Sequence, residues 1–389
     1  MSKSGSAMAA LAQEPAVPPE ISLDLNFVRR FLETHEYQRP VLLLDRTIVR
    51  AKARRFLAAM PRVRPHYAVK ANPHPAVLRV LKEEGVRFEI ASNAELDLLL
   101  QIGVDPHDVL YSNPVKARAW IRHAARAGVE WFVLDSVEEL EKIFSIAPKA
   151  SLYLRIDTPN IGSDWPLAGK FGAHPGEARQ IIARAAELGS DLAGITFHAG
   201  SQCRNPENWH VGIEKALACF DSMRALGLTP RLLNVGGGFP VRHTKPIPAI
   251  EEIAAVINSA IAELPANIEV VAEPGRFMVS DSAYLVCRVI GTTSHAGAHW
   301  MYWDAGVFGG LIETADGLNY RIETDRHGLE VPWNIGGPTC DSVDVVLRDF
   351  PLPADLVDGD FIYIKNAGAY TTPYASEFNG FPLPAIVVV

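Results

Sequence analysis

The stretch His66-Tyr67-Ala68-Val69-Lys70-Ala71-Asn72-Pro73 leads a short apolar strand into a polar turn, and a lysine stands where the two meet. A lysine at the carboxyl end of a buried strand is a candidate for forming a Schiff base, because desolvation disfavours its ammonium form and frees the nucleophilic amine. Most lysines at strand ends are simply solvated. A chemical role for Lys70 therefore depends on the residues that accompany it.

Around this stretch, short apolar runs alternate with amphipathic segments from about Arg64 to Arg276. Such alternation is typical of repeated strand-helix units that build a parallel sheet. Eight strands are expected, over His66–Val69, Phe88–Ala91, Val109–Ser112, Trp131–Leu134, Leu152–Ile156, Gly194–Phe197, Leu232–Val235 and Val270–Glu273. Eight units of this kind predict a (β/α)8 barrel of the TIM type. An open, doubly wound sheet is the alternative, because counting repeats does not prove closure.

The sequence after Arg276 changes to short alternating strands broken by glycine and proline, which predicts a mainly β C-terminal domain. The segment Pro40–Asp45 precedes the barrel strands and could pair with this later sheet, so that both chain ends would build one domain. We expect a disordered tail over residues 1–20, a barrel domain over 41–276, and a β-sheet domain made of 21–40 and 277–389.

The composition narrows the class of protein. The 389 residues carry a net charge of −8 and no long run of lysine and arginine, which argues against nucleic-acid binding and favours small-molecule chemistry. The four cysteines form no CxxC pair, so neither a zinc site nor a disulfide framework is expected. Without an apolar stretch long enough for a signal peptide or a membrane span, we expect a cytoplasmic protein with no metal site.

The candidate chemical groups all follow predicted strands. Lys70 follows the first strand, His198 the sixth, Gly236-Gly237-Gly238 the seventh, and Glu273 closes the eighth. Because the carboxyl ends of barrel strands meet on one face, we expect these residues to share a site. Three consecutive glycines let backbone N–H groups approach an anion closely, although a flexible turn is the simpler reading.

Two charged residues near the last strand support a phosphate-bearing cofactor with a pyridine ring. Arg276 supplies a fixed positive charge for the phosphate, and Ser201 adds a hydroxyl. A carboxylate such as Glu273 can keep a pyridine nitrogen protonated, so that the ring draws electrons from a developing carbanion. The alternatives are an ion pair between Glu273 and Arg276 and, for His198, an ordinary hydrogen-bonded core histidine.

At these positions the chain resembles the fold-type III decarboxylases that depend on pyridoxal phosphate, the ornithine decarboxylase family. The resemblance runs from about Pro40 to the C-terminus and covers six ordered motifs: Tyr67-Ala68-Val69-Lys70-Ala71-Asn72, Phe197-His198-Ala199-Gly200-Ser201-Gln202, Gly236-Gly237-Gly238-Phe239-Pro240, Glu273-Pro274-Gly275-Arg276, Gly337-Pro338-Thr339-Cys340-Asp341-Ser342 and Gly368-Ala369-Tyr370. Three further segments look most like the bacterial members of the family: Asp164-Trp165-Pro166-Leu167, Gly310-Leu311-Ile312-Glu313-Thr314 and Glu377-Phe378-Asn379-Gly380-Phe381. The family's fold is an alanine racemase-like barrel with a β domain.

The resemblance implies a set of roles. Lys70 would bind pyridoxal phosphate covalently, His198 would pack on the ring, and Glu273 would pair with the pyridine nitrogen. The phosphate would be held by Ser201, Gly236, Gly237, Gly238, Gly275, Arg276 and Tyr370, and the same resemblance adds Glu89 and Arg155 to the cofactor site. Two positions depart from the usual pattern: Glu89 is one methylene longer than the common aspartate, and Ala199 replaces a valine, so we expect tuning of the pocket rather than loss of activity.

The family is also known for active sites shared across a head-to-tail homodimer. By the resemblance, Cys340 and Asp341 would reach into the partner's site, where the thiol protonates the carbanion and the carboxylate holds the distal amine of the substrate. Asp316 is expected to face the same end of the substrate, with Tyr370 and Phe378 also in contact, and Glu313 is a weaker candidate.

We therefore expect ornithine to be the substrate, and putrescine and CO2 to be the products. Lysine follows, because one methylene changes binding by only about 1–3 kcal/mol. Diaminopimelate comes last, because the chain has Cys340-Asp341-Ser342 instead of Cys-Glu-Ser and no arginine in Gly309–Gly317 for a second carboxylate. Two alternatives of other kinds are a catalytically inactive regulatory homologue, which retention of Lys70 and Cys340 opposes, and an amino-acid racemase, which Glu273 opposes because racemases carry arginine there.

Overall fold

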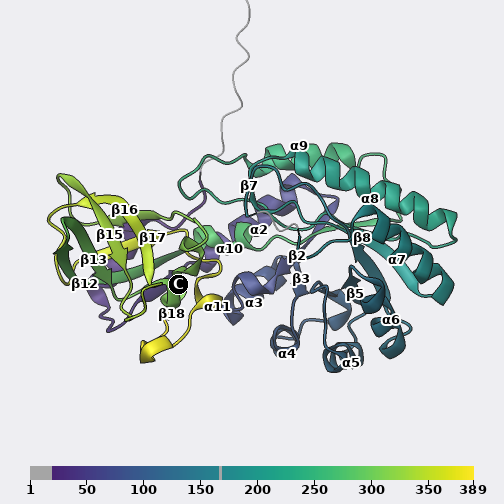
Figure 1. Cartoon of the computed structure of the whole chain (residues 1–389), viewed down its shortest axis with the longest axis horizontal. Helices are drawn as coiled ribbons and strands as arrows, with labels where there is room; N and C mark the ends of the chain where they lie inside the picture. The colour runs from purple at the N-terminus through teal and green to yellow at the C-terminus, as the bar shows by residue number, and fades with distance from the viewer. Residues whose placement is uncertain (1–19, 166–168) are drawn as a thin grey trace, which may run out of the picture.

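The computed structural model describes residues 20–165 and 169–389 and divides into a barrel and a β-sheet domain (Figure 1). The expected N-terminal tail lies almost entirely outside the described residues, as do Pro166 and Leu167 of the bacterial-type motif. In Figure 1 the barrel and its helices fill the right of the view, and the β-sheet domain lies on the left. No helix within the described residues is long and apolar enough to cross a membrane.

The predicted barrel is confirmed. Eight parallel strands close on themselves in the order β10-β11-β2-β3-β4-β5-β6-β8. Their bounds are β2 Val63–Ala68, β3 Arg87–Ile90, β4 Val109–Tyr111, β5 Trp131–Leu134, β6 Ser151–Arg155, β8 Asp191–Thr196, β10 Leu232–Asn234 and β11 Glu269–Ala272. Pairing of β11 with β2 completes the circle, which excludes the open sheet. A short antiparallel pair, β7 Ser163–Trp165 and β9 Ser201–Cys203, lies outside it.

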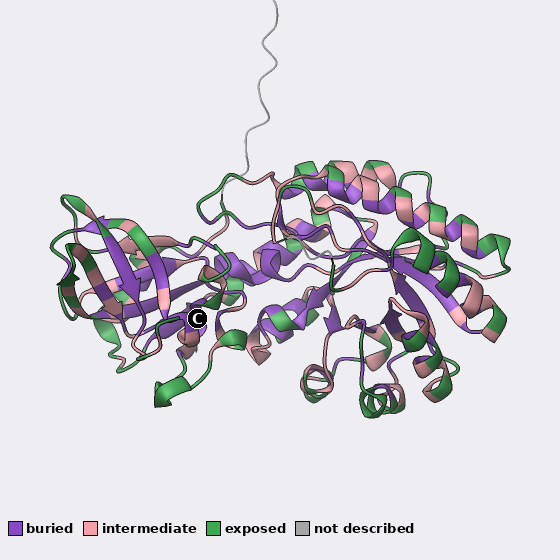
Figure 2. Cartoon of the chain, viewed as in Figure 1, coloured by how far each residue is buried: buried purple, intermediate pink, exposed green. Residues whose placement is uncertain are grey.

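Helices surround the strands because each has one apolar face. Helix α7 buries Ala178, Ile181, Ile182 and Ala185, the spacing of one face of an amphipathic helix, and the outer helical surfaces in Figure 2 are exposed. The helices are α1 Leu25–Thr34, α2 Arg46–Ala59, α3 Pro75–Glu83, α4 Asn93–Gln101, α5 Arg118–Ala127, α6 Val137–Ile146, α7 Pro175–Leu188, α8 Glu207–Ala225, α9 Ile250–Ala260, α10 Arg276–Val279 and α11 Thr371–Tyr374.

The inside of the barrel has its own apolar cluster, separate from the larger core between strands and helices. Leu110, Val133, Tyr153, Leu232 and Val271 form it, each from a different strand. This plug of side chains closes the barrel below its rim, so that only the carboxyl ends of the strands are left to form a site.

The second domain is a sheet built from both ends of the chain. Strands β14, β17, β12, β13, β15 and β16 follow one another in that order, and β1 pairs antiparallel with β12 and parallel with β18. Their bounds are β1 Val41–Leu44, β12 Ala283–His295, β13 Ala298–Trp303, β14 Arg321–Thr324, β15 Glu330–Gly336, β16 Val345–Pro353, β17 Phe361–Lys365 and β18 Ala385–Val388.

The pairing of β1 changes one expected boundary. We expected the barrel domain to begin at residue 41, but Val41–Leu44 hydrogen-bonds to β12 and β18 of the sheet. The physical reason is that β1 is buried along its whole length and finds its partners only in strands from the other end of the chain. We therefore propose that the barrel domain begins with α2.

A buried ion pair fixes the point where the chain passes from barrel to sheet. Lys52 of α2 lies 2.5 Å from Asp281, and both side chains are only 7% exposed. The Lys52 ammonium also lies 4.0 Å from the centre of the Phe277 ring. Because a charge buried without its partner is costly, this pair ties the start of the β domain to the first barrel helix.

Candidate active site

The strand ends at the barrel rim bring together the residues that the sequence singled out. The end of β2 meets the end of β11, since Ala68 N donates to Pro274 O at 3.2 Å, and Glu273 N donates to Gly236 O at 2.8 Å. Lys70 lies in the short 3-10 turn Val69–Ala71 that follows β2. Lysine, glutamate and glycine loop thus sit side by side, although they are far apart in the sequence.

Lys70 is paired with an acid. Its Nζ lies 2.8 Å from Glu89 Oε1; the lysine side chain is half-exposed, whereas Glu89 is 1% exposed and its Oε2 has no hydrogen-bond partner among the described residues. Burial lowers the pKa of Lys70, but the charges of Glu89, Tyr370 and Glu273 raise it by more, so the pKa stands above its ordinary value. The expectation that desolvation frees the amine is wrong, because the neighbouring carboxylates stabilise the ammonium form.

A second acid near Lys70 was not predicted. Glu95 Oε2 accepts a hydrogen bond from Ala91 N at 2.5 Å, and Glu95 N donates to Ser92 Oγ at 3.3 Å. Burial and the charge of Glu89 raise the pKa of Glu95 to about 7. The sequence did hold a signal, since Ser92-Asn93-Ala94-Glu95 has the spacing of a capping box at the start of α4.

Glu273 is held by two hydrogen bonds, neither of which was predicted. Ser112 Oγ donates to Glu273 Oε1 at 2.6 Å, and Asn234 Nδ2 donates to the same oxygen at 2.7 Å. Burial and the charge of Glu89 raise the pKa of Glu273, while the two hydrogen bonds and Lys70 lower it in part. Both donors stand at the ends of barrel strands, where a polar residue after an apolar run is the only sequence signal.

The alternative pairing of Glu273 with Arg276 is wrong. Arg276 is 5% exposed and forms a two-point ion pair with Glu313, in which Nη1 lies 3.1 Å from Oε2 and Nη2 is closer still to Oε1. Its guanidinium also lies 4.9 Å from the centre of the Tyr370 ring. Arg276 begins α10 and points away from the strand end, toward the segment that carries Glu313.

His198 lies over the glycine loop as an uncharged ring. Burial, with the charges of Arg155 and Lys70, lowers the pKa of His198 well below its usual value. Its Nδ1 accepts a hydrogen bond from Gly200 N at 3.0 Å. A Cβ on Gly237 would lie 3.2 Å from His198 Nε2, so the ring is close to the loop backbone.

The glycine loop packs so closely against neighbouring backbone that it cannot carry side chains. A Cβ on Gly236 would lie 2.0 Å from Phe197 O, and one on Gly238 would lie 2.2 Å from Gly200 O. Both residues also have positive φ, at 68° and 99°. On the other side of the rim, a Cβ on Gly275 would lie 3.3 Å from Tyr370 Oη. Glycine is therefore required in this loop, and without side chains its backbone N–H groups can approach an anion closely.

Two further predicted cofactor residues lie at the rim. Arg155 ends β6, where burial lowers its pKa, and its guanidinium stacks 5.5 Å from the Phe171 ring centre. No ion pair neutralises Arg155 within residues 20–165 and 169–389. Ser201 begins β9, half-buried, two residues after the buried Ala199.

The remaining predicted residues are not joined to the Lys70 cluster. Cys340 is exposed on the loop between β15 and β16, with its Sγ 3.5 Å from Asn379 Oδ1, and Asp341 caps the N–H of Val343 at 2.9 Å. Asp316 is exposed and its carbonyl accepts from Trp165 Nε1 at 3.2 Å. Phe378 packs on Phe308 with ring centres 4.6 Å apart. In the described part of the chain, none of these four side chains bonds to Lys70 or Glu273.

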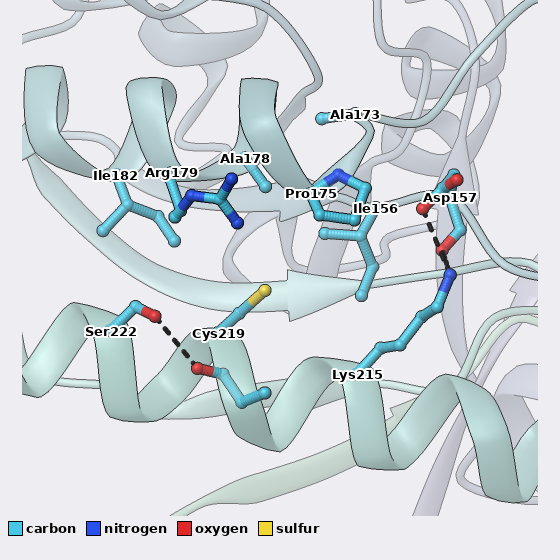
Figure 3. A pocket seen from close by; sticks show the side chains of 11 residues that line it. Ile156, Asp157, Ala173, Pro175, Ala178, Arg179, Ile182, Lys215, Cys219 and Ser222 are labelled. Carbon is cyan, nitrogen blue, oxygen red and sulfur yellow. Dashed lines mark hydrogen bonds and ion pairs between the residues drawn. The ribbon is translucent and has the colours of Figure 1, made fainter.

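Two hollows lie near these residues. A cavity of about 580 Å³ is bordered by Thr314 and Ala315 on one side and by Ser342 and Val343 on the other, so the segments that carry Asp316 and Asp341 face one space. A smaller cavity of about 230 Å³ lies between α7 and α8, with Ile182 on one wall, Cys219 on the other and the Lys215–Asp157 ion pair at one end (Figure 3). The smaller cavity includes none of the predicted residues.

Comparisons with known proteins bear on this arrangement. The family model described as "Pyridoxal-dependent decarboxylase, pyridoxal binding domain" matches residues 46–280. The ornithine decarboxylase of Panagrellus redivivus is 35% identical over 369 residues, covering 89% of this chain and 84% of that protein.

Solved structures agree with the observed fold. The arginine decarboxylase of Paramecium bursaria Chlorella virus, bound to agmatine, superposes with a TM-score of 0.88 at 29% identity over 94% of this chain and 100% of that one. The lysine/ornithine decarboxylase of Vibrio vulnificus, complexed with cadaverine, gives a TM-score of 0.86 at 34% identity over 94% and 98%.

The glycine loop generates a stability prediction. Gly238→Ala should disrupt the loop, because the new Cβ must displace the Gly200 carbonyl. Gly227 also has a positive φ, but no atom lies within 4 Å of the Cβ that Gly227→Ala would add. Gly227→Ala should therefore lower the free energy of unfolding only by the cost of backbone strain, about 1–2 kcal/mol. Melting temperatures with and without inorganic phosphate should show that phosphate stabilises the wild type and Gly227→Ala but not Gly238→Ala. Equal phosphate stabilisation in all three would contradict the assignment of an anion site to the loop.

Proposed function

The chain belongs to the pyridoxal-dependent decarboxylases, and from that premise we propose that it removes the carboxyl group of L-ornithine, giving putrescine and CO2. One observation supports this most strongly: a lysine, Lys70, stands at the barrel rim beside Glu89 while Glu273, anchored by two hydrogen bonds, stands on the next strand end. An amine, an acid close enough to take its proton and a second, fixed carboxylate are what a pyridoxal enzyme needs.

The rim residues fit pyridoxal phosphate. Glu89 Oε2 is buried without a hydrogen-bond partner among the described residues, and the glycine loop has no side chains to keep an anion away from its backbone N–H groups. We propose that the glycine loop, Ser201, Gly275 and Tyr370 hold the phosphate, with Arg276 beside them. When bound, the cofactor supplies the electron sink that accepts the electron pair released with CO2.

The protein groups around that cofactor have separate tasks in the proposed reaction. Glu89, 2.8 Å from Lys70 Nζ, accepts the proton that the lysine must lose before its amine can act as a nucleophile. Glu273 would hold a proton at the pyridine nitrogen when the cofactor is bound. His198, whose pKa is well below its usual value, would pack on the cofactor ring without adding a competing positive charge. Arg155, which has no ion-pair partner among the described residues, faces these carboxylates and balances their charge.

The distal end of the substrate is assigned to acids. We propose that Asp316 and Asp341 bind the terminal ammonium, and the support is the hollow of about 580 Å³ that the segments beside both residues share. Lysine is the second candidate, alone or alongside ornithine, because the similar Vibrio vulnificus protein is named for both substrates. Diaminopimelate is less favoured, and an inactive regulatory role is opposed by the retained Lys70 and Glu273.

The assembly proposed is a homodimer with shared active sites. Cys340 is exposed, and its one hydrogen-bonding partner in the described chain is Asn379, so its thiol is free to serve a neighbouring subunit. Apolar side chains near it are also exposed, at 61% for Val343 and 40% for Phe378. In the proposal, Cys340 Sγ donates the proton to the α-carbon in the partner's site. We also propose a cytoplasmic location, which is supported by four cysteines that form no disulfide.

The activity is tested by measuring CO2 release from L-ornithine, L-lysine, meso-diaminopimelate and the D-forms of the first two, with pyridoxal phosphate added. Ornithine should lead lysine in kcat/KM by about 10- to 200-fold, the range for one methylene. Lys70→Ala should lose all turnover, and Lys70→Arg serves as the matched variant that keeps the charge but not the nucleophile. Near-normal activity in Lys70→Ala, or racemisation without CO2 release, would refute the proposed reaction.

The shared site is tested by mixing two inactive variants. If each site takes Lys70 from one subunit and Cys340 from the other, exchange between Lys70→Ala and Cys340→Ala chains should restore about a quarter of wild-type activity, since half of the dimers are mixed and each has one intact site of two. A mass-spectrometric measurement of subunit exchange is the control. No recovery despite complete exchange would put both residues in the same subunit's site.

A further inference from the structure

Asn234, the last residue of β10, is fully buried and uses both ends of its side-chain amide. Its Nδ2 donates to Glu273 Oε1 at 2.7 Å, and its Oδ1 accepts from Gly236 N at 2.9 Å. The orientation of the amide is fixed, because a backbone N–H can only donate and the atom facing Gly236 must therefore be the oxygen. The NH2 group is left to face the carboxylate.

A second donor reaches the same oxygen of Glu273 by a different route. Ser112 Oγ gives its proton to Glu273 Oε1, and the hydroxyl of Tyr153 lies 2.6 Å from Ser112 Oγ. Because the serine has only one proton, Tyr153 must donate to Ser112. The result is a chain of hydrogen bonds that runs from the apolar interior of the barrel to its rim.

These bonds fix the carboxylate in one orientation. Within the described residues, both hydrogen bonds to Glu273 end on Oε1, which leaves Oε2 to face a ligand. Asn234 is neutral, so it anchors the carboxylate without adding a charge of either sign. The side-chain oxygen of Asn234, Oδ1, accepts the hydrogen bond from Gly236 N and so forms an Asx turn at the start of the glycine loop.

We propose that Asn234 is a positioning residue that couples the two subsites of the cofactor: its Nδ2 orients Glu273 against the pyridine nitrogen, and its Oδ1 shapes the glycine loop around the phosphate. This inference rests on the proposed function and deepens it. One buried side chain then links the ring subsite to the phosphate subsite, because its Nδ2 bonds to Glu273 and its Oδ1 bonds to Gly236.

The charged and titratable groups that face Glu273 have to be considered together. Lys70 follows β2, Glu89 lies on β3, and Tyr153 and Arg155 lie on β6. Glu89 opposes ionisation of Glu273, whereas Lys70 favours it. A neutral donor such as Asn234 favours the ionised carboxylate whatever the protonation of those neighbours, since a hydrogen bond to the charged form always lowers a carboxyl pKa.

Three substitutions separate the two tasks in the holoenzyme. Asn234→Ala removes both hydrogen bonds. Asn234→Ser keeps an acceptor for Gly236 N, because a serine hydroxyl forms the same turn more weakly, but it is too short to reach Glu273. Ser112→Ala is the matched control, since it removes the other donor to Glu273 Oε1 and leaves the loop contact untouched.

The role of Asn234 at the ring subsite is tested by measuring how kcat/KM depends on pH. Loss of a donor raises the pKa of Glu273, so the acid limb of the kcat/KM profile should move to higher pH by about one unit in all three variants. The visible absorbance of the bound cofactor should shift over the same pH range, which gives a readout independent of turnover. An acid limb and a spectrum that stay at the wild-type pH in Asn234→Ser would overturn this half of the inference.

The role of Asn234 at the phosphate subsite is tested by measuring the affinity of the apoenzyme for inorganic phosphate. Asn234→Ala should bind phosphate roughly tenfold more weakly, the effect of about one hydrogen bond, whereas Asn234→Ser and Ser112→Ala should bind it nearly as well as the wild type. Unchanged phosphate binding in Asn234→Ala would overturn this half. If Asn234→Ala does not fold, a tenfold loss of phosphate affinity in Ser112→Ala would overturn it, because that variant leaves the contact of Asn234 with the loop intact.

The test also separates this inference from the proposed function. A wild type that binds pyridoxal phosphate but releases no CO2 would contradict the decarboxylase assignment, while the absorbance and phosphate measurements on the same variants would still decide the role of Asn234.

Discussion

Pairing of β11 with β2 closes the barrel and brings Glu273 beside Lys70. In an open sheet these two strands would lie at opposite edges, and the lysine and the acid would never meet. The contact is direct, because Ala68 N, next to the turn of Lys70, donates to Pro274 O. Glu273 N also donates to Gly236 O, so that two backbone hydrogen bonds hold the turn of Lys70, the segment of Glu273 and the glycine loop next to one another.

Three carboxylates, those of Glu89, Glu95 and Glu273, lie at the rim near Lys70. Glu89 lies on β3, Glu95 lies in the helix that follows β3, and Glu273 follows β11. Burial and the charge of Glu89 raise the pKa of both Glu95 and Glu273. Lys70 and Arg155 offset that charge. The arrangement suits a ligand with a protonated ring nitrogen. One carboxylate can serve as the counter-ion of that nitrogen, while another accepts the proton of the lysine.

Much of the fold could be predicted because it rests on local patterns. Alternating apolar and amphipathic segments specify the strand count, and Lys70, His198, the three glycines and Glu273 all stand directly after such strands. The position of β1 could only be guessed, since its partners β12 and β18 come from the far end of the chain. Its apolar Val41–Leu44 looks the same in a barrel as in a sheet.

The parts of the site that escaped prediction depend on partners distant in sequence. Ser112 and Asn234 look like ordinary polar residues at strand ends until the barrel closes around Glu273. Arg276 was a reasonable partner for Glu273 three residues away, yet it reaches across to Glu313. Cys340 and Asp341 have no bond to the Lys70 cluster in the described chain, so the fold of one subunit does not place them at that cluster.

The most direct test of the account is to locate the covalent attachment of the cofactor. Holoenzyme prepared with pyridoxal phosphate would be reduced with borohydride, digested and mapped by mass spectrometry, with Glu273→Ala as a comparison that keeps the lysine. The account predicts that the label is on Lys70 alone, in the wild type and in that variant. Label on another lysine, or none on Lys70 in a protein that binds the cofactor, would contradict it.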